Sequence, residues 1–109
     1  MQYSGKWRIT EMAQWDSDYL DMEVEAYIEI DQTGSGEFQF GLVSGEIDGE
    51  VVKDGKDQRF EFTSDGNDEN DPASGSGWLK LNDKNSLDGR VKFHQRDSYS
   101  LVAKRISSK

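Results

Sequence analysis

The sequence predicts an all-β protein, a small eight-stranded antiparallel up-and-down meander that closes into a barrel. Two observations carry this prediction. Apolar and polar residues alternate in one short run after another, and polar, glycine-containing turns separate the runs. A chain of 109 residues suits one hydrophobic core, so we expect a single domain over residues 1–109. Local patterns do not reveal whether the last strand pairs with the first, and an open sheet folded into a sandwich is the alternative.

Four strands are expected in the first half of the chain: one before Glu11, one over 24–30, one over 37–42 and a weaker one over 47–52. The run 24–30 alternates most clearly. Its apolar side chains all fall on one face, as in a strand with one face in water. The turns between these strands are expected at 31–34 and at Ser44-Gly45.

Gly41 and Gly49 fall inside the expected strands. Glycine in a strand often marks a bulge or a sharp bend. We expect both residues at corners of the barrel.

The second half begins with Asp54-Gly55, a strong hairpin signal because both central positions of such a turn favour positive φ. A strand with Phe60 and Phe62 follows it. Residues 64–76 contain the only proline and many polar turn formers, so we expect a long loop there. The last three strands are expected around 78–81, 87–93 and 99–106.

The connection from Glu11 to Glu23 has a different pattern. Met12, Trp15, Tyr19 and Met22 recur at intervals of three and four, which places them on one face of a short helix. We expect a helical connection that lays this apolar face across one end of the barrel as a plug. An irregular loop is the alternative.

Charge and composition exclude several classes of function. The net charge is −9, which would repel phosphate backbones, so we expect no nucleic-acid partner. The chain contains no cysteine, which fits a reducing, cytoplasmic location. We expect no export signal and no membrane association, because the chain starts without a signal-peptide pattern and lacks an apolar run long enough to span a bilayer.

The charge is also uneven along the chain. Residues 1–77 hold 19 acidic and 5 basic residues, whereas residues 78–109 hold 3 acidic and 8 basic residues. Cross-strand pairing between neighbouring strands would account for this distribution. The other interpretation is a basic face on the last strands that docks an acidic partner or another copy of the chain head to tail.

Gly5-Lys6-Trp7 in the first expected strand resembles the G-x-W start of the calycin superfamily, which includes lipocalins and avidins. In lipocalins this tryptophan packs near a basic residue of the last strand. The resemblance therefore implies a structural closure made by Gly5, Trp7 and Arg105, or Lys104 in place of Arg105. The helical connection after the first strand also looks like the lipocalin arrangement. The segments 15–19 and 68–75 further resemble a small family of bacterial proteins without an assigned activity.

The resemblance also implies a small apolar ligand, since calycin barrels commonly hold one. Barrels of this size are either filled by side chains or hold one small ligand, and bulky inward residues favour a largely filled core. The expected inward residues are Trp7, Ile9, Val24, Ile28, Ile30, Phe38, Phe40, Leu42, Phe60, Phe62, Trp78, Val91, Phe93, Tyr99 and Leu101. If a pocket exists, we expect Trp15, Tyr19 and Trp78 at its mouth and Phe40, Phe62 and Tyr99 around it.

Residues with catalytic or metal-binding potential are few. The acidic segment 65–71 carries oxygen ligands but lacks the glycine and the final glutamate of an EF-hand, so we expect no metal and no cofactor. Asp16, Asp18 and Asp21 lie beside aromatic residues, as in a carbohydrate-active or hydrolytic cleft. His94, the only histidine, is expected to be exposed at the end of a strand. The site residues do not favour an enzyme.

The function expected from the sequence is a noncatalytic binding module that holds a small apolar or aromatic ligand at the end of the barrel. One alternative is a protein–protein interaction module that uses its charged outer face. Another is an enzyme that uses Asp16, Asp18 and Asp21. We expect a monomer or a weak homo-oligomer.

Overall fold

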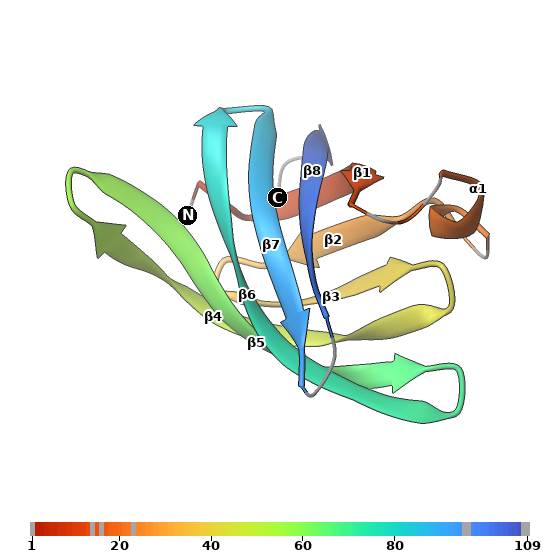
Figure 1. Ribbon diagram of the computed structural model, residues 1–109. Coiled ribbons are helices and arrows are strands. Elements are labelled where there is room, and N and C mark those ends of the chain that lie inside the picture. Colours follow the sequence, from red (N-terminus) through yellow and green to blue (C-terminus); the bar gives the residue numbers. More distant parts are fainter. Residues whose placement is uncertain (1, 14, 16, 23, 95–96, 108–109) are drawn as a thin grey trace.

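Eight antiparallel strands form a closed barrel in which each strand pairs with the next along the chain and β8 returns to β1 (Figure 1). This is a computed structural model, and it describes residues 2–13, 15, 17–22, 24–94 and 97–107. The predicted fold class is confirmed, and the sandwich alternative is wrong because the pairing of β8 with β1 leaves the sheet closed.

The elements follow one another as a meander with one short helix after the first strand. They are β1 (Gly5–Met12), α1 (Ser17–Leu20), β2 (Tyr27–Ile30), β3 (Ser35–Phe40), β4 (Val43–Asp54), β5 (Asp57–Asp68), β6 (Asp71–Asp83), β7 (Ser86–Phe93) and β8 (Ser98–Ser107). Two long hairpins, β4–β5 and β5–β6, extend beyond the body of the barrel (Figure 1). Among the described residues, no helix has the length and apolarity of a membrane span.

The turn between β3 and β4 is displaced from its expected position. The chain reverses at Gly41 and Leu42, and Ser44 lies within β4. Gly41 adopts a φ of 58°, and a Cβ there would lie 2.4 Å from the ring of Tyr19. Only glycine fits both the backbone and the aromatic neighbour, which decides where the turn forms. The predicted turn at Ser44-Gly45 is therefore wrong.

Gly49 was also expected at a bend, but it lies in an unbroken ladder opposite Phe62. A Cβ at Gly49 would lie 2.7 Å from the ring of Phe60. The glycine makes room for this aromatic ring in the core and does not mark a bulge. The register shifts occur instead between β1 and β8 and near Leu81 on β6.

The predicted loop over 64–76 is wrong, because these residues form the distal halves of β5 and β6. The ladder continues to Asp68 and Asp71, and Glu69 turns the chain with a φ of 57°. Small residues occupy successive inward positions of this hairpin, where Ser64 faces Gly75 and Gly66 faces Ala73. The strands alternate in burial without bulky apolar residues, so a hydrophobic pattern does not reveal them.

The strand expected over 24–30 starts later, at Tyr27. The carboxylate of Asp21 accepts a hydrogen bond of 2.9 Å from the backbone N–H of Ala26, so this N–H is bound to a side chain directly before the strand begins. Val24, expected to face inward, is 45% exposed as a result.

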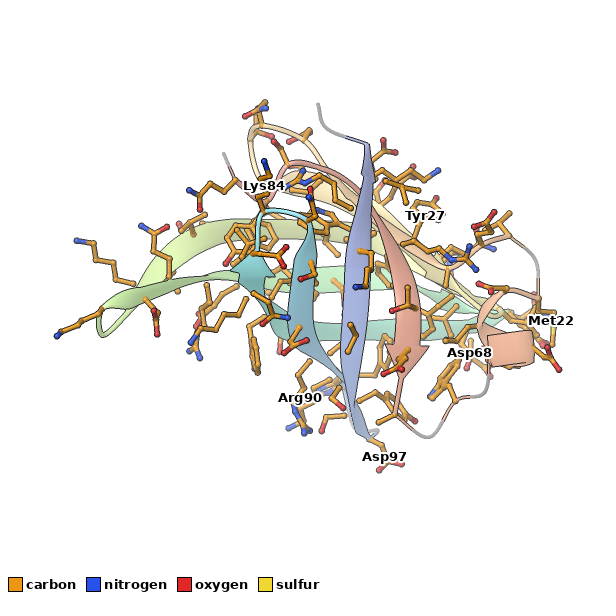
Figure 2. The ribbon with its side chains drawn as sticks, turned by 90° about the horizontal axis from the view of Figure 1, so that it is seen from above. Met22, Tyr27, Asp68, Lys84, Arg90 and Asp97 are labelled. Atoms are coloured by element: carbon orange, nitrogen blue, oxygen red, sulfur yellow. The ribbon has the colours of Figure 1, made fainter. Side chains whose placement is uncertain are left out.

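The connection after β1 contains the helix α1, as predicted, and it covers one end of the barrel (Figure 1). The backbone carbonyl of Leu20 accepts a hydrogen bond of 2.8 Å from Gly41 and joins the helix to the β3–β4 turn. Trp15 packs against the core, but Met22 is 53% exposed and lies at the outer edge beside α1 (Figure 2). The shared helix face predicted for Met12, Trp15, Tyr19 and Met22 is wrong. Only Tyr19 lies on α1, because Met12 ends β1, Trp15 forms an isolated β-bridge with Met12, and the helix ends before Met22.

The core fills the barrel with side chains from every strand. Eleven of the expected inward residues are buried, and Tyr99 packs against them while partly exposed. The exceptions are Val24, Leu42 in its turn, and Trp78. Leu79 is fully buried and occupies the inward position, which turns its neighbour Trp78 to the outside of β6.

Candidate functional site

Among the described residues, the barrel interior leaves little room for a ligand. Its cavity measures about 20 Å³ and is lined by core side chains that include Phe40 and Phe62. A cavity of this size holds about one water molecule, whereas pockets for drug-sized ligands measure roughly 300–1,000 Å³. Phe40 and Phe62, expected beside a ligand, therefore fill the space that a ligand would need.

Four of the expected ligand-binding residues meet at the plugged end of the barrel. The ring centroid of Trp15 lies 4.7 Å from that of Tyr19, 5.0 Å from that of Phe40 and 5.5 Å from that of Tyr99. These distances and the tilted geometries are those of packed aromatic pairs. The rings contact one another and form a lid on the core.

Trp78 is not part of this lid. It lines an open groove of about 710 Å³ between residues of β1, β6, β7 and β8, and this groove also reaches Trp15. Two of the three residues expected at a pocket mouth thus share an outer groove.

Gly5, Trp7 and Arg105 come together at the seam between β1 and β8. Gly5 starts β1 with a φ of 123°, and Trp7 is fully buried. The guanidinium of Arg105 lies over the indole ring of Trp7, 4.2 Å from its centroid. It also donates hydrogen bonds of 2.7 to 2.8 Å to the backbone carbonyls of Gln2, Ser4 and Lys84. Arg105 thereby joins the segment before β1, the β6–β7 turn and β8.

The carboxylates considered for catalysis do not form a pair in the described structure. Asp16 lies outside the described residues, and Asp18 is exposed on α1. Asp21 forms an ion pair of 3.1 Å with Arg8 and accepts the N–H of Ala26. These contacts give Asp21 a structural task in the connection to β2.

The acidic segment 65–71 and His94 likewise show no reactive arrangement. Within the described residues, no group of three or more histidine, cysteine, aspartate or glutamate side chains could hold a metal ion. His94 is exposed directly after β7, and its backbone N–H donates to the carbonyl of Ser74 at 2.6 Å.

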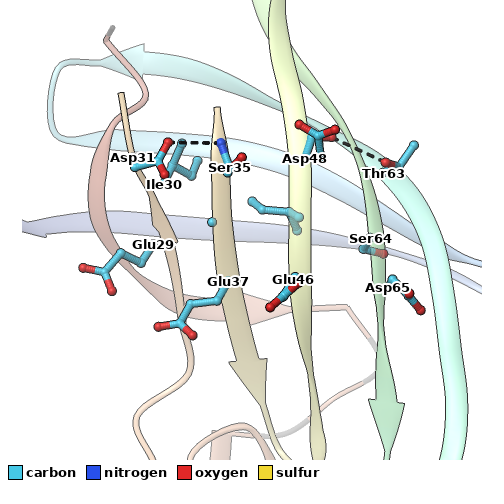
Figure 3. A pocket seen from close by; sticks show the side chains of 12 residues that line it. Glu29, Ile30, Asp31, Ser35, Glu37, Glu46, Asp48, Thr63, Ser64 and Asp65 are labelled. Atoms are coloured by element: carbon cyan, nitrogen blue, oxygen red, sulfur yellow. Dashed lines mark hydrogen bonds between the residues drawn. The ribbon is translucent and has the colours of Figure 1, made fainter. Parts of the chain in front are cut away.

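A row of acidic residues crosses the outside of four neighbouring strands. Glu29 on β2 lies opposite Glu37 on β3, which lies opposite Glu46 on β4, which in turn lies opposite Asp65 on β5. Together with Asp31 and Asp48 they line an open groove of about 640 Å³ (Figure 3). We call these six residues the acidic face.

The side chains of Tyr27 and Lys6 lie beside the acidic face. The pKa of Tyr27 is raised, first by burial and then by the negative charges of Glu37 and Glu29. The ammonium of Lys6 lies 4.7 Å from the centre of the Tyr27 ring, and Lys6 is opposite Glu29 in the ladder. The acidic face thus has a cationic and aromatic border on its β1 side.

At the end of the acidic face, the pKa of Asp31 is lowered below its ordinary value. The main cause is the hydrogen bond from the hydroxyl of Thr33, followed by that from its backbone N–H. Asp31 holds the β2–β3 turn and contributes a fixed negative charge to the groove.

Ion pairs that involve other carboxylates lie elsewhere on the barrel. Arg59 pairs with Glu61, Lys80 pairs with Asp57, and Arg8 pairs with Asp21 and Glu25. Figure 2 shows Arg90 and Lys84 away from Tyr27, in line with the basic excess of the last three strands.

The acidic face is not among the sites expected from the sequence. The alternation of β2 and β3 already places Glu29 and Glu37 on the outer face. The opposition of Glu37 and Glu46 depends on the turn at Gly41-Leu42, and Asp65 falls in the segment predicted to be a loop. The sequence does show acidic residues at outward positions of successive strands. It does not show the strand register that places them opposite one another.

No protein-family model matches this chain, and comparisons with curated proteins and with solved structures found no match.

Proposed function

We propose that this barrel is a noncatalytic interaction module whose acidic face binds a cationic segment of a partner protein. The observation that carries the proposal is the row of Glu29, Glu37, Glu46 and Asp65, directly opposite one another along an open groove. Like charges in directly opposite positions destabilise a sheet. Lysine or arginine side chains laid across the row would remove this repulsion, and the gain would contribute to binding.

The filled interior favours the outer surface over a ligand inside the barrel. A ligand at the plugged end would have to displace Trp15 from its contacts with Tyr19, Phe40 and Tyr99. An open groove on the acidic face needs no such rearrangement.

We also infer a calycin-like relationship for the barrel. The Gly5-Lys6-Trp7 start, the guanidinium of Arg105 over Trp7, the meander order and the helix after β1 support it. The proposed function does not depend on this relationship, because it rests on the outer surface.

Calorimetric titration with octalysine tests the proposal. We expect binding that weakens as salt is added, because the charges of an open groove are screened over about 10 Å at 0.1 M salt. The double variant Glu37→Gln/Glu46→Gln should weaken binding about threefold to tenfold at low salt, the range for two exposed ion pairs.

The matched control is Glu11→Gln/Glu69→Gln, which removes the same charge from exposed positions outside the acidic face. We expect the control to change the affinity much less. An equal loss in both double variants would mean that octalysine responds to net charge alone, and the proposed site would be wrong.

A further inference from the structure

The three tryptophans of the chain have different surroundings. Trp7 is fully buried beneath Arg105, and Trp15 packs among three aromatic rings. Trp78 is half-buried and points out of β6. Among the described residues, cationic groups lie over the rings of Trp7 and Tyr27 and not over that of Trp78. Trp78 also lines two open grooves on the outside of the sheet.

Charged residues flank Trp78 in the ladder. Glu61 on β5 and Arg90 on β7 are its direct neighbours, and Glu50 on β4 lies opposite Glu61. The guanidinium of Arg90 donates to the hydroxyl of Ser98 at 2.7 Å. The carboxylate of Glu61 accepts a hydrogen bond of 2.7 Å from Nε of Arg59. Glu61 is thus held by Arg59 of its own strand, and Arg90 is held by Ser98 of the adjacent strand β8.

The outer surface is continuous from the acidic face to Trp78. A second open groove, of about 660 Å³, is lined by Trp78, Glu50 and Glu61, and it shares Asp48 and Thr63 with the groove of the acidic face. A chain bound along the acidic face can follow these two grooves across β4 and β5 to the ring of Trp78. The aromatic ring then stands at the end of a path lined by carboxylates.

We propose that Trp78 stacks on an arginine side chain of the cationic partner segment. This inference rests on the proposed function and names the residue type at one end of that segment. A guanidinium is planar and stacks on aromatic faces, whereas an ammonium is a compact and more strongly hydrated charge. Arg105 and Trp7 form the same kind of pair within this molecule.

The spacing of strands fixes where this arginine lies in the partner. Glu37 on β3 is three strands away from β6, and the ladder places it in register with Ser74, four residues before Trp78. Three strand spacings of about 4.8 Å and four residues of about 3.4 Å place Trp78 about 20 Å from Glu37. An extended chain covers that distance in about six residues. The partner segment therefore carries its arginine about six residues from the basic residue over Glu37.

Titrations with octaarginine and octalysine test the inference. We expect the protein to bind octaarginine about twofold to fivefold more tightly than octalysine, the range of an exposed cation–π contact. Trp78→Leu keeps an apolar side chain of moderate size without the ring, and it should abolish the preference by weakening octaarginine binding more than octalysine binding. Trp78→Tyr should restore part of the preference.

NMR provides a second measurement that does not rely on the variants. Octaarginine should shift the indole N–H signal of Trp78. It should leave that of Trp7 in place, because the Trp7 N–H donates to the carbonyl of Tyr3 inside the protein. An octaarginine preference that survives in Trp78→Leu, or an unmoved Trp78 signal, would overturn the inference and leave the proposed function intact. Failure of both peptides to bind the wild type would contradict the proposed function itself.

Discussion

At the seam between β1 and β8 and in the connection that leads to β2, charged side chains meet partners that hold the chain together. Arg105 covers Trp7 and donates to three backbone carbonyls, and Arg8 pairs with Asp21 and Glu25. Across β2 to β5 the arrangement is reversed, because carboxylates of neighbouring strands lie opposite one another. The difference separates charges that stabilise the fold from charges that do not. Removal of the first kind should destabilise the barrel, and neutralisation of the second kind should stabilise it.

The largest effect is expected at Arg105. Arg105→Ala should lower the free energy of unfolding by about 2–4 kcal/mol, because it leaves three carbonyls without their charged donor and uncovers Trp7. Arg105→Lys keeps the charge but not the planar fork, and its loss should be smaller. Urea denaturation measures both variants. A change below about 0.5 kcal/mol in Arg105→Ala, the range of ordinary surface substitutions, would contradict this account of the seam.

A smaller loss is expected at Asp21. Asp21→Ala removes the acceptor of the Ala26 N–H as well as the partner of Arg8, and should destabilise the protein by about 1 kcal/mol. Asp21→Asn retains an oxygen acceptor and should lose about half as much. Thermal unfolding of the two variants separates the hydrogen bond from the ion pair. Equal losses would indicate that the hydrogen bond to Ala26 contributes nothing measurable.

On the acidic face, we expect substitution to raise the free energy of unfolding and not to lower it. Glu37→Gln/Glu46→Gln removes all three like-charge oppositions of the row and should raise the free energy of unfolding by about 0.5–1 kcal/mol. Added salt should reduce this difference, since it screens the repulsion in the wild type. Glu11→Gln/Glu69→Gln serves as the control of equal charge. If the control stabilises the protein as much, net charge and not the row is the cause.

The smallest effect concerns Asp31. Its pKa lies below the ordinary value of 3.8, so the charged carboxylate is favoured in the folded state. The associated stability is present above the unfolded-state pKa and is lost as the pH falls through the lowered folded-state pKa. Thr33→Val removes the hydroxyl donor and should raise the pKa of Asp31, as NMR titration of its carboxyl group can measure. An unchanged titration midpoint would show that the Thr33 hydroxyl has no part in the shift.

The strand order was predictable from the sequence because most strands carry bulky apolar residues at alternate positions. The distal part of the β5–β6 hairpin was not, since Ser64, Gly66, Ala73 and Gly75 fill its inward positions. These residues are small enough for two strands to lie close together, but their composition is also that of a loop. Burial of backbone and small side chains leaves no hydrophobic pattern in the sequence.

The orientation of Trp78 was ambiguous for a different reason. Trp78 and Leu79 are adjacent apolar residues, and only one of them can face the core. The pairing of Leu79 with Gly89 and its complete burial decide the question in the structure. The acidic face depends in the same way on register, which the turn at Gly41-Leu42 sets.

The pairing of Trp7 with Arg105 also has a kinetic consequence. All other strand pairs join neighbours in the chain, whereas this ladder joins residues almost a full chain length apart. Closing so long a loop carries the greatest entropy cost of any pairing in the barrel. We therefore expect the hairpins to form first and the β1–β8 seam to close last. Arg105→Ala should then accelerate unfolding and leave the folding rate nearly unchanged. Arg105 would thus set the lifetime of the closed barrel.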